Sequence, residues 1–446
     1  SLCKDRYFLM KRYAYRQLKS WREKPDNMRK PLIIEGARQT GKTWLATEFG
    51  KHEFKKIVTI NFEDAEPIRS IFELDFDINR IILAIQAYTQ QTIVPGNTLI
   101  FFDEIQYARR GLLSLKYFKE KAPQYHVIAA GSLLGVIDHK NDSFPVGKVE
   151  FLRIYPLCFE EFLLAIGQQG MVDLLHSRDW AAIQAFEQQM TNYLRLYYYV
   201  GGMPEAVKTF AESLDYKAVR TVHEQLLKSY HNDFSKHPPQ EIVKRMQLLW
   251  QSVPQQLSKE NKRFVYSAVR GSARAKDFET SIQWLQDAGL IYKITRVVAG
   301  EIPLAGFEEP ENFKLYMLDI GLLGAMNNMS ETTLIEGNQF FAQYKGALTE
   351  QFVLQELQCA EIKPIHYWAP ETGIAEVDFV IQHENDIIPI EVKAERNLRA
   401  KSLAAFINRY HTPQAIRTSL SSYQHGDTVT DLPLYAISIL KEVFHD

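Results

Sequence analysis

A glycine-rich segment that ends in lysine and threonine is the part of the sequence best suited to chemistry. Residues 36–43 read GARQTGKT and fit the pattern G-x-x-x-x-G-K-[ST]. Glycines at both ends let backbone N–H groups curl around a phosphate, and a helix that begins near Lys42 adds its positive end. The Lys42 ammonium would reach the β- and γ-phosphates, and the Thr43 hydroxyl would bind Mg²⁺. The predicted contacts to ATP or ADP are Gly36, Ala37, Arg38, Gln39, Thr40, Gly41, Lys42, Thr43 and Trp44.

A second motif supplies the carboxylates that this chemistry needs. The apolar run Leu99–Phe102 leads into Asp103 and Glu104, and ligands bind at the carboxyl ends of strands in open α/β sheets. Asp103 would hold Mg²⁺, and Glu104 would polarise the water that attacks the γ-phosphate. Alone, such a run is equally typical of an ordinary strand end. With the phosphate loop upstream, it predicts the catalytic half of an ATPase site.

Two further positions are candidates with an alternative beside each. The apolar run Val127–Ala130 is followed by Gly131 and Ser132, so Ser132 would either sense the γ-phosphate or cap the next helix. Arg153 follows another strand candidate and is either the arginine that stabilises the transition state or a solvated strand-end residue.

The elements that must position these residues follow from hydrophobic periodicity. Short apolar runs predict strands, and stretches with an apolar residue every three or four positions predict the helices between them. Strands alternating with helices indicate a buried parallel sheet of the α/β class. The predicted strands are 31–35, 57–62, 98–103 and 127–130, and the predicted helices between them include 78–88 and 112–121.

The pattern changes after Pro156. Helical periodicity runs from Phe159 to about Glu260, and a helix at 275–288 then precedes strands at 290–298 and 314–318, an order typical of a winged helix. A long helix from about Phe340 precedes strands at 376–381 and 387–394. We therefore expect a P-loop ATPase core at 1–156 with a basic helix at 1–30, a helical lid at 157–235, a winged-helix-like region at 236–330, and an α/β domain at 331–446.

Composition narrows the class of protein. The 446 residues carry a net charge of −2, which excludes a globally basic nucleic-acid coat. Three widely spaced cysteines (Cys3, Cys158 and Cys359) form neither a disulfide framework nor a metal knuckle and suit a reducing compartment. No apolar run reaches membrane-spanning length and no secretory signal is recognisable. We expect a cytoplasmic protein with no membrane partner.

Two local basic stretches are candidates for nucleic-acid contact. The first 30 residues hold ten Lys and Arg against three acids, and residues 258–276 hold six against one. Either stretch would track phosphates of DNA or RNA, although a solvated basic face is an equally good interpretation. The first stretch would alternatively touch nucleotide or a partner chain. A homo-oligomer is compatible with the sequence.

The first half of the chain resembles the AAA+-related ATPases of the archaeal-ATPase type. GARQTGKT and FFDEIQ carry the resemblance, and Leu157–Phe162 is similar to the family's junction motif. Lys148 stands where that junction usually carries Arg. Gly201–Ala206 (GGMPEA) is similar to the family's lid motif, which implies that Pro204 lies near the adenine. The resemblance implies binding and hydrolysis of Mg·ATP, in agreement with the motifs.

Two carboxylates in the last third of the sequence invite a geometric argument. If 376–381 and 387–394 pair through the turn at Glu384-Asn385, Asp378 lies opposite Glu391. Opposed like charges destabilise a sheet unless a cation neutralises them. Lys393 is one candidate cation, and Mg²⁺ or Mn²⁺ is another. Glu350 lies on the apolar stripe of the preceding helix and should point inward.

This part of the chain resembles the uncharacterised domain that commonly follows such ATPases, through 314–323, 346–357, 367–368, 376–381 and 388–394. The pattern Asp378…Glu391-x-Lys393 is also that of the PD-(D/E)XK nuclease superfamily. That likeness implies that Glu350, Asp378 and Glu391 hold a second Mg²⁺ or Mn²⁺, and that Lys393 positions the attacking water. The alternative is a solvated hairpin face with a Glu–Lys ion pair.

Together these features predict an ATPase whose hydrolysis cycle drives domain rearrangement, acting on nucleic acid through the winged-helix-like and nuclease-like regions. One alternative is an ATP-dependent switch in signalling or defence, whose last domain binds without cutting. Another is a metal-dependent nuclease that ATP regulates.

Overall fold

The computed structural model describes residues 11–131, 145, 147–234, 239–259, 262–269, 271, 274–332, 339–394 and 400–444, with only the backbone of 339–344. The chain forms two compact units. The first unit is Lys11–Tyr155 with Asp287–Gly289, and the second comprises Pro156–Gln286 and Leu290–Asp446. The boundaries expected near residues 235 and 330 both fall inside the second unit.

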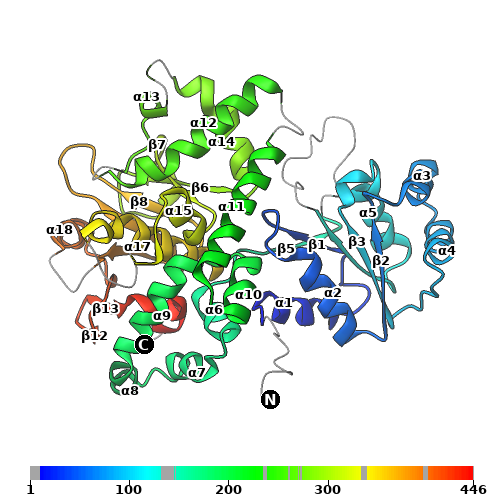
Figure 1. Ribbon diagram of the computed structural model, residues 1–446, viewed down its shortest axis with the longest axis horizontal. Coiled ribbons are helices and arrows are strands. Elements are labelled where there is room, and N and C mark those ends of the chain that lie inside the picture. The colour runs from blue at the N-terminus through cyan, green and yellow to red at the C-terminus, as the bar shows by residue number, and fades with distance from the viewer. Residues whose placement is uncertain are drawn as a thin grey trace. The chain divides into compact units, whose positions relative to one another are not determined.

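A five-stranded parallel sheet forms the centre of the first unit (Figure 1). The predicted strands are confirmed to within one residue at each end, and a fifth strand joins them at the edge. The strand order is β2-β3-β4-β1-β5, so β4 lies between the strand before the phosphate loop and the strand that ends in Asp103. The strands are β1 (Leu32–Glu35), β2 (Lys56–Asn61), β3 (Thr98–Asp103), β4 (His126–Ala130) and β5 (Glu150–Arg153).

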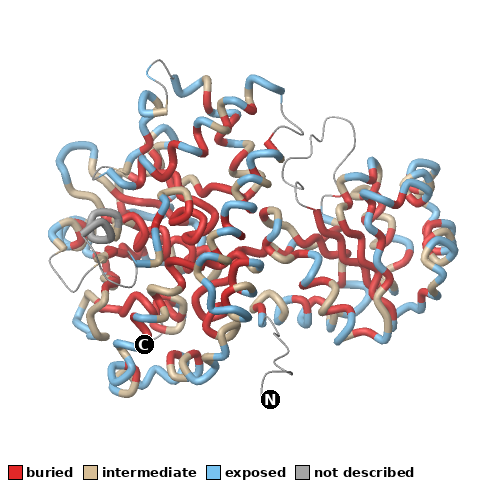
Figure 2. The backbone as a smooth tube through the Cα atoms, viewed as in Figure 1, coloured by how far each residue is buried: buried red, intermediate tan, exposed pale blue. Residues whose placement is uncertain are grey.

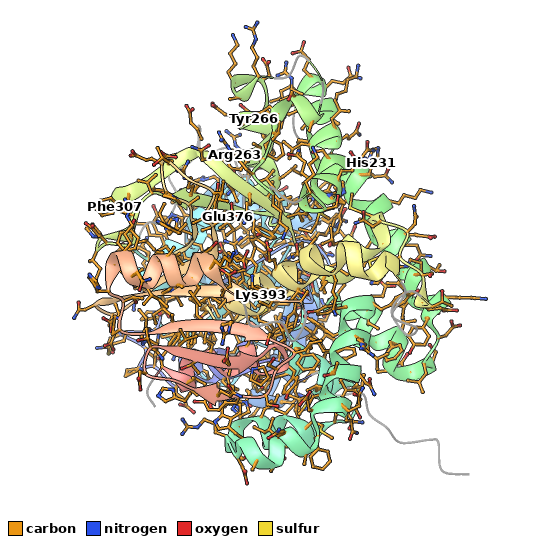
Figure 3. All side chains as sticks on the ribbon, turned by 90° about the vertical axis from the view of Figure 1, so that its left-hand side faces the viewer. His231, Arg263, Tyr266, Phe307, Glu376 and Lys393 are labelled. Atoms are coloured by element: carbon orange, nitrogen blue, oxygen red, sulfur yellow. The ribbon has the colours of Figure 1, made fainter. Side chains whose placement is uncertain are left out.

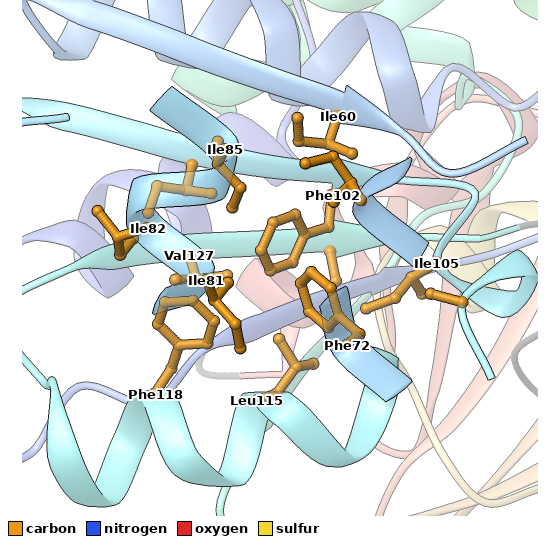
Figure 4. Packing of buried hydrophobic residues seen from close by; sticks show 14 of the residues in the cluster. Ile60, Phe72, Ile81, Ile82, Ile85, Phe102, Ile105, Leu115, Phe118 and Val127 are labelled. Carbon is orange, nitrogen blue, oxygen red and sulfur yellow. The ribbon is translucent and has the colours of Figure 1, made fainter. Parts of the chain in front are cut away.

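Helices cover both faces of this sheet because every central strand is apolar on both sides. On β3, Ile100 and Phe102 pack against one helical layer, where Phe102 meets Phe72 and Phe118 edge to face (Figure 4). Leu99 and Phe101 pack on the opposite face. The helices are α1 (Ala14–Arg22), α2 (Lys42–Glu53), α3 (Glu66–Leu74), α4 (Ile78–Thr89) and α5 (Gly111–Lys121).

The second unit combines many helices with one mixed sheet of eight strands in the order β12-β13-β11-β10-β9-β8-β6-β7. In Figure 2 the strands of both sheets are largely buried, whereas most surrounding helices are exposed along one side. The strands are β6 (Ile291–Val297), β7 (Glu308–Met317), β8 (Ile365–Trp368), β9 (Val377–His383), β10 (Asp386–Val392), β11 (Ala415–Ser419), β12 (Gln424–His425) and β13 (Val429–Pro433).

The helices of the second unit begin with the predicted helical stretch after Pro156. They are α6 (Phe159–Ala165), α7 (Gln169–Ser177), α8 (Trp180–Ala185), α9 (Glu187–Val200), α10 (Pro204–Ser213), α11 (Tyr216–Asp233), α12 (Gln240–Leu257), α13 (Tyr266–Val269), α14 (Ala275–Asp287), α15 (Ile320–Met326), α17 (Gln339–Cys359), α18 (Lys401–Tyr410) and α19 (Leu440–Val443). Among the described helices, none combines the length and apolar character that crossing a membrane requires.

The structure contains the elements of the expected winged-helix region but does not confirm a separate winged-helix domain. Its helix and its two strands are present as α14, β6 and β7, and the strands pair antiparallel. The hairpin does not form a sheet of its own, because β6 also pairs in parallel with β8. It therefore extends the sheet of the last third of the chain.

The predicted register of β9 and β10 is confirmed. Phe379 pairs with Ile390, and Val380 pairs with Pro389. Continuing this antiparallel register by one residue sets Asp378 opposite Glu391.

Candidate nucleotide site and a carboxylate–lysine cluster

The phosphate loop connects β1 to α2, as its motif requires. Gln39 and Gly41 have positive φ angles of 65° and 92°, and alternation of left- and right-handed residues turns successive N–H groups into one concavity. Helix α2 begins at Lys42, so its first N–H groups, which have no acceptor within the helix, face the same place. The loop thus has the backbone shape of an anion site.

Lys42 is buried within this loop, with 7% of its surface exposed. Its Nζ donates hydrogen bonds to the carbonyl oxygens of Gly36 (2.9 Å) and Ala37 (2.7 Å). Burial lowers the pKa of Lys42 to about 8, although the carboxylates of Glu104 and Asp103 oppose this shift. The ammonium is therefore held at the loop and loses its proton more readily than an ordinary lysine.

Thr43 and Asp103 meet at the start of α2. The Thr43 hydroxyl donates to the Asp103 carboxylate at 3.0 Å (Oδ2) and 3.2 Å (Oδ1). Burial raises the pKa of Asp103, although the hydrogen bond from Thr43 opposes the shift. A hydroxyl and a carboxylate oxygen in contact are two adjacent ligands of the kind that Mg²⁺ takes beside phosphates. These residues fit the metal that the motif implies.

Glu104 follows Asp103 in the left-handed conformation, with φ of 50°. Its backbone N–H donates to Asp103 Oδ1 at 3.1 Å, and its carboxylate accepts a hydrogen bond from the Gln106 side chain. The carboxylates of Asp103 and Glu104 therefore have different partners: Asp103 contacts Thr43, and Glu104 contacts Gln106.

The remaining predicted nucleotide residues are less informative. Arg153 ends β5 beside Glu35 and lies over the Tyr155 ring, 5.8 Å from its centre. Trp44 is partly exposed on α2, and Ser132 lies outside the described residues. Pro204 begins α10 in the second unit. Their roles stay predictions.

In the second unit, charged side chains gather at β9, β10 and α17. Glu350 is buried, as its helical stripe predicts. Asp378 Oδ2 accepts a hydrogen bond from the N–H of Val392 at 2.8 Å. Glu391 Oε1 accepts one from Lys393 Nζ at 2.6 Å, and Oε2 is buried with no hydrogen-bond partner.

Two lysines and a tyrosine that the sequence analysis did not assign to this site contact its carboxylates. Lys262, grouped with the basic stretch at 258–276, instead forms an ion pair with Glu350. The Tyr316 hydroxyl donates to the other oxygen of Glu350 at 3.1 Å. Lys314 is fully buried on β7 and its Nζ lies 2.6 Å from Glu376. The sequence carried one signal for this placement: Lys314 and Tyr316 are two residues apart in a strand, so their side chains share one face of it.

Burial and the closeness of several charged groups shift the pKa values of the carboxylates in this cluster. Burial raises the pKa of Asp378 well above its ordinary value, and Glu350 and Glu391 add to the shift. Burial also raises the pKa of Glu391, against the effect of Lys393. Glu350 differs, because Lys262 and Lys314 lower its pKa despite burial. We call Glu350, Glu376, Asp378, Glu391, Lys262, Lys314 and Lys393 the carboxylate–lysine cluster.

The residues of the carboxylate–lysine cluster give no support to the second metal ion that the sequence analysis expected. Lysine ammonium groups hold oxygens of Glu350, Glu376 and Glu391. Among the residues that the structure describes, no three His, Cys, Asp or Glu side chains are grouped so as to hold a metal. Lysine, one of the two candidate cations that the sequence offered, is thus in contact with these oxygens.

Three segments of the chain match known families. Residues 28–163 match a family described as an AAA domain. Residues 191–333 and 345–437 match two families described as domains of unknown function, DUF8612 and DUF4143. The segment 28–163, which holds the phosphate loop, is therefore similar to AAA domains, and these matches assign no function to the rest.

Comparison with solved structures gives distant likenesses, and no curated protein matches the chain. The Walker-type ATPase PABY2304 of Pyrococcus abyssi is 12% identical, with 70% of this chain and 94% of that chain covered and a TM-score of 0.44. Cdc6p from Pyrobaculum aerophilum is 11% identical, with 72% and 93% covered and a TM-score of 0.23. Drosophila ORC bound to DNA is 13% identical, with 69% and 92% covered and a TM-score of 0.22.

Proposed function

We propose that this chain binds Mg·ATP at the phosphate loop and hydrolyses it. The observation that carries the proposal is the contact of Thr43 with Asp103, 3.0 Å from hydroxyl to carboxylate, beside a buried lysine at a helix N-terminus. Phosphate oxygens would therefore meet a lysine and helix N–H groups here, and a metal ion would meet a hydroxyl and a carboxylate in the same place.

Each residue has a separate task in the proposed reaction. The loop N–H groups and Lys42 receive the β- and γ-phosphates, and Lys42 exchanges its carbonyl partners for phosphate oxygens. Thr43 and Asp103 hold Mg²⁺, which supplies charge neutralisation on the phosphate oxygens when bound. Glu104 accepts the proton of the attacking water, since Asp103 is already engaged with Thr43.

Hydrolysis rates of matched variants test this proposal. We expect Glu104→Gln to lower the rate of phosphate release by about 10²–10⁴-fold, because an amide cannot accept the proton of water. Lys51→Ala is the control, since Lys51 is an exposed residue on α2 that pairs with Glu48 at the surface. Equal rates in wild type and Glu104→Gln would contradict the assignment of the base.

We further propose that the cycle acts on nucleic acid through the second unit. Three exposed cations support this: Arg274 and Lys276 lie at the start of α14, and Arg263 precedes α13. Figure 3 shows Arg263, Glu376 and Lys393 one below the other. Lys262 takes no part in this surface, because it pairs with Glu350.

Stimulation of ATP hydrolysis by DNA or RNA separates this proposal from the switch alternative. We expect the rate to rise several-fold with nucleic acid in wild type and to respond less in Arg263→Ala. Lys441→Ala, a change of the same charge on α19, is the control. A rate that ignores both DNA and RNA would favour the ATP-dependent switch.

A further inference from the structure

Arg12 is a buried arginine just before α1. Only 6% of its surface is exposed, although arginine is almost never buried unless its charge and donors are matched. It precedes residues 28–163 and so lies outside the segment that matches the AAA family. In the sequence it stands out only as one of ten basic residues.

Both terminal nitrogens of Arg12 contact the backbone around the phosphate loop. Nη1 donates to the carbonyl oxygen of Thr40 at 3.1 Å, and Nη2 donates to that of Tyr155 at 2.5 Å. Thr40 belongs to the last turn of the loop. Tyr155 follows Ile154, whose N–H donates to the Glu35 carbonyl oxygen at 2.8 Å. Arg12 therefore bridges the end of the loop to the segment that lies along its beginning.

The contact with Thr40 fixes a peptide group that would otherwise turn easily. In a trans peptide the C=O of one residue and the N–H of the next point in opposite directions. Because Arg12 holds the Thr40 carbonyl, the Gly41 N–H must point away from Arg12. Gly41 has φ of 92°, and glycine adopts either sign of φ at little cost. The restraint on this peptide therefore comes from outside the loop.

We propose that Arg12 is a positioning residue of the nucleotide site, which orients the Thr40–Gly41 peptide so that the Gly41 N–H faces the bound phosphate. The inference rests on the proposed binding of ATP. It extends the site to the basic N-terminal stretch, for which the sequence left nucleotide, DNA and a partner chain open.

A purely structural role, as an anchor for α1, makes a different prediction. Helix α1 is already held by Leu18 and Trp21, which are both buried in the core. The Trp21 indole also donates to the Lys30 carbonyl oxygen at 2.7 Å. Loss of Arg12 should therefore weaken phosphate binding far more than it lowers stability.

The experiment compares full-length wild type, Arg12→Gln, Arg12→Lys and the control Arg16→Gln, in which an exposed arginine on α1 loses the same charge. Calorimetric titration with Mg·ATPγS and with Mg·ADP gives the affinities. Hydrogen–deuterium exchange over residues 36–44 reports the loop amides. Thermal unfolding of each variant reports stability.

We expect Arg12→Gln to lower both affinities by about tenfold or more, with the loop amides no longer protected by ATPγS. Arg12→Lys, which keeps a charged donor, should recover part of the affinity, and Arg16→Gln should match wild type. Equal binding by wild type and Arg12→Gln would overturn this inference alone. A loss of affinity in Arg12→Gln and Arg12→Lys that only follows a lower melting temperature would also overturn it. Failure of wild type to bind either nucleotide would overturn the proposed function itself.

Discussion

At the scale of single residues, Lys42 is the group on whose charge the account depends most. Its position in the motif predicts that it is a phosphate ligand, but its protonation could not be read from the motif. Burial is what lowers its pKa to about 8, although the carboxylates of Glu104 and Asp103 oppose the shift. A lysine with this pKa is charged at neutral pH and loses its proton only slightly above it.

The affinity for nucleotide should therefore depend on pH above about pH 8. Below pH 8 Lys42 is already protonated, whereas above pH 8 a bound phosphate must draw a proton back onto it. We expect the affinity for Mg·ATPγS to fall by up to about tenfold per pH unit above that point. Calorimetry at pH 9, in two buffers of different ionisation enthalpy, should detect proton uptake. The same affinity at pH 7 and pH 9, without proton uptake, would show that Lys42 is not the phosphate ligand.

At the scale of elements, local patterns predicted the strands of the first unit and the register of β9 with β10. They failed where distant segments meet. The β6–β7 hairpin is recognisable locally, but its pairing with β8 joins Arg296 to Tyr367. Lys262 similarly finds Glu350 on a helix far along the chain. Contacts between residues far apart in the sequence leave no periodic pattern in it. The sequence analysis therefore placed Lys262 on a basic surface.

One glycine of the phosphate loop is required by its neighbours. A Cβ on Gly36 would lie 2.4 Å from the carbonyl oxygen of Ile154, whereas one on Gly96 would meet nothing within 4 Å. Both have positive φ, 149° and 75°. We expect Gly96→Ala to lower the free energy of unfolding by about 1 kcal/mol, and Gly36→Ala to lower it by about 3 kcal/mol because the overlap adds to the strain. Urea unfolding measures both, and equal losses would contradict the contact.

At the scale of the whole molecule, the important result is that one sheet joins parts of the chain that the sequence assigned to separate domains. The six strands from 365–433 lie next to one another in it, and the two strands from 291–317, β6 and β7, extend it beyond β8 at one edge. The carboxylate–lysine cluster draws on both parts, because Lys314 comes from β7 and Asp378 from β9. The expected boundary at residue 330 therefore runs through a shared structure.

Fragments of the chain test this arrangement. We expect residues 157–446 to fold and melt cooperatively. Residues 331–446 alone should not, because the fragment lacks β6 and β7 and deprives Glu350 of Lys262 and Tyr316. Circular dichroism and backbone NMR spectra of the two fragments measure the difference. A cooperative melt of 331–446 would show that the boundary at 330 is real.

The most direct measurement of the central claim is the ATP retained by Glu104→Gln, with Lys42→Ala as its comparison. Glu104→Gln should hold about one unhydrolysed ATP per chain in the presence of Mg²⁺, because it keeps the loop, Thr43 and Asp103 while lacking the base. Lys42→Ala should hold almost none. Retention of ATP by neither variant, or equally by both, would contradict the account of this loop as the site of ATP binding and hydrolysis.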